Sequence, residues 1–278
     1  TGHGKKEIRM KKKTGLVALL TSALLVLCCG CAAPENDMLQ LDVSKLKEGQ
    51  YTFATRQVNG DVASDYDTVY TVSKYTDESG RARIRIESHG EKGAESIDSV
   101  NVLLGQKENG RTEMSPVSVS MDYKNNDNTQ QNVSVNVDHL FNQGKIEIHV
   151  KQYPKNSNEM TASDYTVNVN SQYYDSETLP FVISCLSLYK DLKLNFTLSS
   201  SNRDSVQSMC LTVAEVTSIK DANDNEVECY AVVVRPNTAF TSTATYMYYS
   251  TADNSLVKIQ QSSISFTFKS FAPPAIAD

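Results

Sequence analysis

Three cysteines lie within four residues, at Cys28, Cys29 and Cys31. Thiols at such spacing could bind a metal ion, form a disulfide bond or carry a covalently attached lipid. A lipid-attachment site differs from the other two because an export signal must precede it. The residues before the cluster therefore decide which chemistry the sequence favours.

The preceding stretch has the three-part organisation of an export signal. Three lysines at positions 11–13 follow Met10, and an apolar run extends over residues 16–29. This run is too short for a mature membrane-spanning helix. Gly30 supplies the small residue that signal peptidases require before the cut. We expect cleavage to leave Cys31 as the first mature residue.

Residues 25–31 resemble the lipobox of bacterial lipoproteins. The resemblance implies that Cys31 receives a diacylglyceryl group, with acyl chains such as palmitate. Cys28 and Cys29 would leave with the signal peptide, so the cluster is not a metal site. An uncleaved anchor or a plain secretory signal are the alternatives. The predicted location is the cell envelope, with the protein anchored by lipid on the periplasmic or cell-surface side of a membrane.

The predicted mature chain is strongly acidic. Removing residues 1–30 takes away six of the 27 basic residues and one of the 33 acidic residues, which leaves 21 minus 32, a net charge of −11. Such a chain repels phosphate backbones and anionic headgroups. We therefore expect no nucleic-acid partner, and membrane contact only through the N-terminal lipid.

Cys185, Cys210 and Cys229 are the other cysteines. Their odd number and wide spacing argue against a disulfide framework and against tetrahedral zinc. Small buried apolar residues are the simpler interpretation. No cofactor is predicted.

Alternation of apolar and polar residues dominates the chain after Gly49 and predicts strands with one solvent-exposed face. Turn-forming residues separate these strands, for example at 59–61, 79–80, 108–110 and 142–144. A meander of antiparallel strands follows from this arrangement. The alternating segments are residues 51–55, 70–75, 83–87, 117–121, 133–137, 146–150 and 165–169.

Residues 176–189 break the alternation. Capping residues, Pro180 in the first turn and dense apolar positions predict a short buried helix that covers one end of the sheet. Further strands are expected at 192–198, 209–219, 227–234, 241–249 and 256–268. The predicted fold class is mainly β: a large antiparallel curved sheet or half-open barrel with one short helix.

The predicted organisation has three parts. Residues 1–30 comprise residues upstream of Met10 and the signal peptide, and residues 31–48 form a polar tether. Residues 49–270 form a single large β domain, with two halves that could meet near 171–178.

Four segments resemble the TapB-like family of bacterial envelope proteins, whose function is largely undefined. They are residues 173–181 with 186–188, then 211–216, 229–234 and 246–259. The resemblance implies a curved sheet or half-open barrel wrapped about a short helix, and it carries over no catalytic residues.

Two further groups could bind ligands. Asp221, Asn223, Asp224 and Glu226 resemble the calcium linker of cadherins, although a turn explains these residue types equally simply. Five aromatic residues could line a groove for an apolar or glycan ligand, with ordinary core packing as the alternative. They are Tyr173, Tyr174, Phe181, Tyr246 and Tyr248.

The histidines His89, His139 and His149 lack the partners of a nucleophilic triad, and no Gly-x-Ser-x-Gly motif occurs. We therefore expect no enzyme, but a lipid-anchored binding or assembly module with an unknown apolar, glycan or protein ligand. The alternatives are a carrier that holds a lipid or another hydrophobic ligand in a half-barrel groove, an envelope hydrolase with an unfamiliar site, and a surface structural protein or adhesin.

Overall fold

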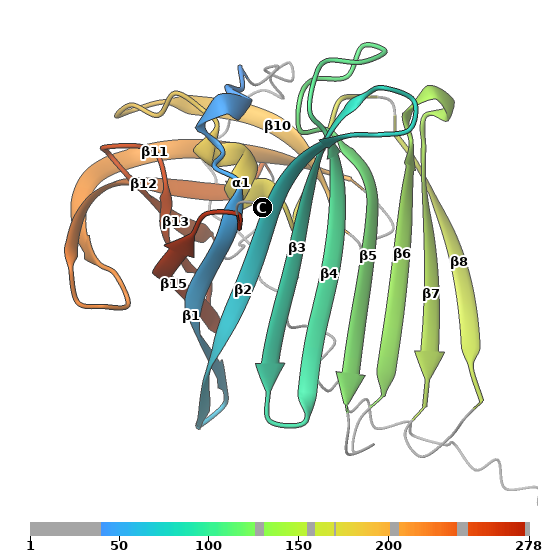
Figure 1. Ribbon diagram of the computed structural model, residues 1–278, viewed down its shortest axis with the longest axis horizontal. Helices are drawn as coiled ribbons and strands as arrows, with labels where there is room; N and C mark the ends of the chain where they lie inside the picture. The colour runs from blue at the N-terminus through green and yellow to red at the C-terminus, as the bar shows by residue number, and fades with distance from the viewer. Residues whose placement is uncertain are drawn as a thin grey trace, which may run out of the picture.

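The computed structural model describes residues 40–125, 131–154, 159–169, 171–200, 206–237 and 244–275. These residues form one fifteen-stranded sheet in the order β8-β7-β6-β5-β4-β3-β2-β1-β15-β14-β13-β12-β11-β10-β9. Every neighbouring pair is antiparallel except β9 and β10. The sheet is curved and unclosed, and one short helix packs on it (Figure 1). The predicted fold class is confirmed.

The first eight strands form an uninterrupted meander. The predicted turns at 59–61, 79–80 and 142–144 all connect neighbouring strands. Strand β4 was not predicted from the sequence, although its residues alternate, and it pairs with both β3 and β5. The strands are β1 (Gly49–Asn59), β2 (Val62–Thr76), β3 (Ala82–Lys92), β4 (Glu95–Leu104), β5 (Pro116–Asn125), β6 (Asn132–Leu140), β7 (Lys145–Tyr153) and β8 (Thr161–Asn168).

The second half continues the same sheet from its other side, because β15 pairs with β1. The strand predicted at 256–268 is wrong as one element: it is divided into β14 and β15 by a turn at residues 261–263. The strands are β9 (Tyr174–Asp175), β10 (Lys193–Ser199), β11 (Gln207–Lys220), β12 (Glu226–Pro236), β13 (Thr245–Ser250), β14 (Leu256–Gln260) and β15 (Ile264–Ala272).

Helix α1 (Leu179–Ser184) confirms the predicted short buried helix. Val182 and Ile183 are fully buried in it. The Tyr249 hydroxyl donates to the Pro180 carbonyl at 2.9 Å, and the Asp42 amide donates to the Cys185 carbonyl at 2.9 Å. Both ends of the helix are thus fixed by distant parts of the chain.

The main hydrophobic core contains residues from both halves of the sheet together with α1. In Figure 1 strands β10–β12 run across the direction of β2–β8, and α1 lies between them. A smaller cluster lies on β5–β8 and includes Val137, Ile148 and Tyr173. The concave side is therefore filled by packed side chains around the helix.

The last residues of the predicted tether are part of this core. A 3₁₀ helix, η1 (Val43–Lys45), precedes Leu46, which is buried, and Leu41 packs against the same cluster. The Lys45 ammonium donates to the Leu186 carbonyl at 2.9 Å. The β domain therefore begins at or before Leu41, ahead of the boundary at Gly49.

Candidate functional site

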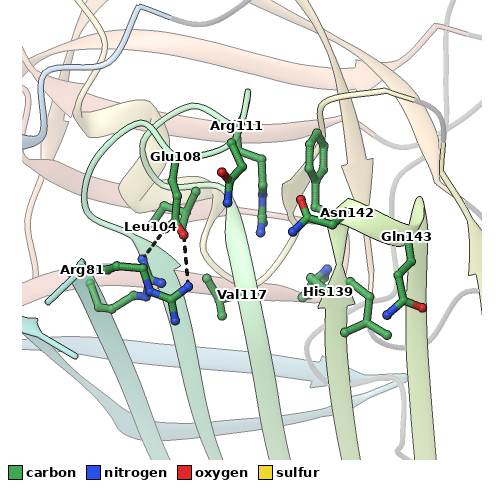
Figure 2. A pocket seen from close by; sticks show the side chains of 12 residues that line it. Arg81, Leu104, Glu108, Arg111, Val117, His139, Asn142 and Gln143 are labelled. Atoms are coloured by element: carbon green, nitrogen blue, oxygen red, sulfur yellow. Dashed lines mark hydrogen bonds and ion pairs between the residues drawn. The ribbon is translucent and has the colours of Figure 1, made fainter. Parts of the chain in front are cut away.

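A pocket lined by both charged and apolar side chains opens at one end of strands β3–β6, beneath the β4–β5 loop and the 3₁₀ helix η2 (Phe141–Gln143) (Figure 2). Its volume is about 250 Å³. The lining residues are Arg81, Arg83, Leu104, Glu108, Asn109, Arg111, Val117, His139, Leu140, Phe141, Asn142 and Gln143. We call it the rim pocket.

The turn Asn109–Gly110 positions two charged side chains of the rim pocket. Both residues have positive φ, 49° and 78°, which is the two-residue hairpin geometry that Asn-Gly favours. Glu108 and Arg111 are paired directly across it, with backbone N–H to carbonyl distances of 3.1 and 2.8 Å. Directly paired residues point to the same face, so both side chains reach the pocket.

Two of the three arginines are neutralised by acidic partners. The Arg83 guanidinium is 4% exposed and lies 2.9 Å from Glu108 and 3.0 Å from Asp77. Arg81 contacts the same carboxylates at 3.1 and 3.0 Å. The hydrogen bond from Arg83 is the largest influence that lowers the pKa of Glu108. Both arginines thus hold the Glu108 carboxylate at one wall of the pocket, where Figure 2 shows it close to Arg81.

Arg111 has no such partner. It is 9% exposed, and its Nη2 atom is buried without a hydrogen-bond partner among the described residues. Its guanidinium carbon lies 5.3 Å from the centre of the Phe141 ring, a cation–π contact that holds the side chain without neutralising it. Burial lowers the pKa of Arg111, but an arginine still keeps its proton. A largely buried positive charge therefore lies in the pocket, and it forms no ion pair within the described residues, although the charge of Glu108 acts on it.

His139 is the second buried polar group. It is 5% exposed, and its Nδ1 lies 3.1 Å from the Tyr173 hydroxyl. Burial and then the charge of Arg111 lower the pKa of His139 to about 3, so the ring is neutral at physiological pH. Burial raises the pKa of Tyr173 to about 12. The Nε2 atom of His139 is buried and has no partner within the described residues.

Residues 172–174, at the start of β9, fix the loop above the pocket. The Tyr174 hydroxyl and the Gln172 amide reach the Thr112 hydroxyl at 3.0 and 3.1 Å. Gln172 also donates to the Ser115 hydroxyl. Since Tyr173 contacts His139 from the same segment, the chain between β8 and β9 holds both sides of the rim pocket in place.

The five aromatic residues predicted for a ligand groove do not share one surface. Tyr173, Tyr174 and Phe181 are buried, and the Phe181 ring packs against Tyr70 at 5.3 Å. Tyr246 is 44% exposed on the side of β13 opposite the core residues Met247 and Tyr249. Tyr248 shares the face of Tyr246. The predicted groove is wrong, because three of the rings are packed in the core. The other two, Tyr246 and Tyr248, lie on the opposite face of the sheet.

The calcium candidate forms the β11–β12 turn. The Asp221 carboxylate accepts hydrogen bonds from the Asn223 and Asn225 amides at 2.8 and 2.9 Å, and these bonds help to lower its pKa. Asp224 pairs with Lys220 at 3.4 Å, and Glu226 lies near Ser218. These carboxylates thus have hydrogen-bond or ion-pair partners in or beside the turn. Within the described ranges, no group of three His, Cys, Asp or Glu side chains could hold a metal ion.

Several other predictions concern single residues. Cys31, the predicted lipidation site, lies outside the described residues. Cys185 and Cys229 are buried and free, as expected of small core residues, whereas Cys210 is half-buried. His149 lies at the surface of β7 and pairs with Asp164 at 2.9 Å. None of the helices in the described part of the chain is long and apolar enough to span a membrane.

The sequence analysis missed Arg111 and the contact between His139 and Tyr173. The Asn-Gly turn was recognised, and the hairpin pairing that it implies could have placed Glu108 and Arg111 on one face. The position of His139 carries no local signal, because Tyr173 arrives from a segment beyond two further strands.

Comparison with known proteins finds structural similarity but no sequence match. No family model matches the chain, and no curated protein matches it. A crystal structure of a β-barrel-like protein, a domain of unknown function DUF1849 from Brucella abortus, aligns with a TM-score of 0.46 and 8% identity. The alignment covers 82% of this chain and 98% of that chain. The resemblance to the TapB-like family stays a prediction.

Proposed function

We propose that this protein is a lipid-anchored, non-enzymatic binding module of the cell envelope that binds a ligand carrying an acidic group in the rim pocket. The observation behind the binding site is the desolvated Arg111, which has no acidic partner within the described residues. An unpaired buried charge is costly for stability, and a bound anion would supply the missing partner. The lipid anchor rests on the signal and lipobox pattern that ends at Cys31.

The chemistry of the pocket supports binding rather than catalysis. No serine, threonine, cysteine or lysine lines it, so the usual nucleophiles are missing from its described walls. The Glu108 carboxylate is held by two arginines, and the low pKa of His139 makes it a poor proton donor at physiological pH. The hydrolase alternative would need two ionisable groups free to exchange protons.

The filled concave side argues against the hydrophobic carrier. That alternative needs a continuous apolar groove, but α1 occupies the concave side with Leu179, Phe181, Val182 and Ile183 buried against both halves of the sheet. A small rim pocket that contains a buried arginine therefore supports the binding module better than it supports an acyl-chain carrier.

Native mass spectrometry of the protein purified gently from its own host tests the binding site. We expect the wild type to carry a small acidic compound that Arg111→Met loses, because the variant removes the charge and keeps much of the side-chain volume. An acidic ligand retained undiminished by the variant would contradict the proposal. A ligand-free mass for both proteins would contradict it equally.

The anchor has a separate test. Labelling cells with radioactive palmitate should mark the wild-type protein and leave Cys31→Ser unlabelled. Equal labelling of both proteins, or of neither, would reject attachment at this cysteine.

A further inference from the structure

We propose that the acidic group is a single carboxylate on a small ligand with an apolar body, read jointly by Arg111 and by the Nε2–H of His139. This inference rests on the proposed function and specifies its ligand. It comes from the charge, the polar atoms and the apolar wall of the rim pocket.

The charges around the rim pocket add up to one free positive charge. Arg81 and Arg83 are matched by Asp77 and Glu108 at distances of 2.9–3.1 Å, which leaves Arg111. His139 and Tyr173 are both neutral at physiological pH. One anionic charge is therefore compensated here, and a second would meet the Glu108 carboxylate of the same pocket.

The arginine suits a planar acceptor. Guanidinium donors match a carboxylate in geometry, and the contact with the Phe141 ring restricts how the group can turn. The buried Nη2 is the donor without a partner within the described residues, so a carboxylate oxygen satisfies it when the guanidinium turns toward the pocket.

The histidine supplies a second, neutral donor. Tyr173 keeps its proton and can donate it to Nδ1 of His139, at 3.1 Å. The ring proton then lies on Nε2, the nitrogen that lacks a partner. A bound carboxylate would favour this tautomer, because its oxygens accept hydrogen bonds and the Nε2–H can donate one. A cationic ligand group would instead be repelled by Arg111.

The remaining wall selects for an apolar body. Leu104, Val117, Leu140 and Phe141 line the rim pocket alongside the polar residues. A volume of about 250 Å³ limits the ligand to a small molecule or the end of a larger one. Short aliphatic monocarboxylates therefore fit the charge, the donors and the apolar surface together.

Thermal unfolding of the full chain with three probes tests the inference. The probes are sodium butyrate, its neutral analogue butyramide, and inorganic phosphate at mildly alkaline pH, all at one ionic strength set with sodium chloride. Ligand that binds the folded state raises the unfolding midpoint as its concentration increases. We expect butyrate to raise the midpoint of the wild type more than either other probe, with an apparent affinity that falls about tenfold or more in Arg111→Met.

The outcomes separate the two proposals. If phosphate stabilises the wild type as well as butyrate does, and Arg111→Met loses both effects, the pocket binds anions but the monocarboxylate assignment is wrong. Equal stabilisation by butyrate and butyramide also overturns it. If no anion distinguishes the wild type from Arg111→Met, the proposed function falls together with the inference.

Discussion

Replacing Arg111 with methionine should stabilise the ligand-free protein, although the residue is buried. A buried polar group without a partner costs about 1–3 kcal/mol, and more when it is charged. Methionine removes that cost and keeps an unbranched side chain against Phe141, while the cation–π contact at 5.3 Å is lost. Such a contact contributes about 0.5–2 kcal/mol, and a sulfur–aromatic contact replaces part of it.

The balance is a gain of about 1 kcal/mol in the free energy of unfolding, or a rise of about 2–4 °C in the unfolding midpoint for a domain of this size. The assay is reversible urea unfolding, supported by thermal scans, on protein stripped of ligand by refolding. Truncation of a residue that the fold needs lowers the stability of the protein, whereas truncation of a residue that serves only binding does not.

Arg83→Met is the matched control, because it makes the same substitution in the same pocket. Arg83 is 4% exposed and paired with Asp77 and Glu108, so its removal takes away the buried member of the two arginines that these carboxylates share and leaves them only the exposed Arg81. We expect it to lower the free energy of unfolding, because the buried Arg83 side chain loses two ion pairs that methionine cannot make. If Arg111→Met destabilises the protein as much as Arg83→Met does, the reasoning about an uncompensated charge is refuted.

Three more predictions concern the pocket and the core. The pKa of His139 is about 3 in the folded protein and 6.5 when exposed, so only the unfolded state gains this proton as the pH falls between these values and stability is lost. Between neutral pH and about pH 5, the free energy of unfolding should fall by about 2 kcal/mol less in His139→Gln than in the wild type. Parallel curves of unfolding free energy against pH for the two proteins would contradict the burial of a neutral His139. Ile183→Ala in α1 should lower the free energy of unfolding in urea by about 2–5 kcal/mol, since the side chain is fully buried, and a loss no larger than at a surface site would mean that the helix is not central to the core. Burial and the nearby Glu177 raise the pKa of Asp175 well above its usual value, which costs stability as the pH rises beyond the unfolded pKa of 3.8. Asp175→Asn should therefore match or exceed the wild-type midpoint at neutral pH, and a clear loss would show that the ionised carboxylate is needed.

Strand alternation was sufficient to predict most of the sheet. Residues 51–55 and 146–150, for example, lie within β1 and β7, because each strand has one covered face and one exposed face. The break between β14 and β15 was missed because the connecting residues 261–263, Gln-Ser-Ser, include neither glycine nor proline. Local pattern also did not show that β15 pairs with β1, which brings the two halves into one sheet.

The rim pocket was less accessible to sequence reasoning. Glu108 and Arg111 are brought together by a recognisable turn, but the ion pairs of Glu108 with Arg81 and Arg83 depend on how the β2–β3 hairpin lies beside the β4–β5 loop. Tyr173 reaches His139 only because the chain returns across β6–β8. Alternating residues identify the faces of strands, whereas a pocket at strand ends depends on the lengths and directions of separate loops.

A crystal structure of the wild-type protein soaked with sodium butyrate tests the central claim most directly. The account predicts a carboxylate in the rim pocket with an oxygen within hydrogen-bond distance of both Arg111 Nη2 and His139 Nε2, and with its carbon chain against Leu104 and Val117. A pocket that contains only water at a saturating butyrate concentration, with the Arg111 guanidinium turned to another protein acceptor, would contradict it.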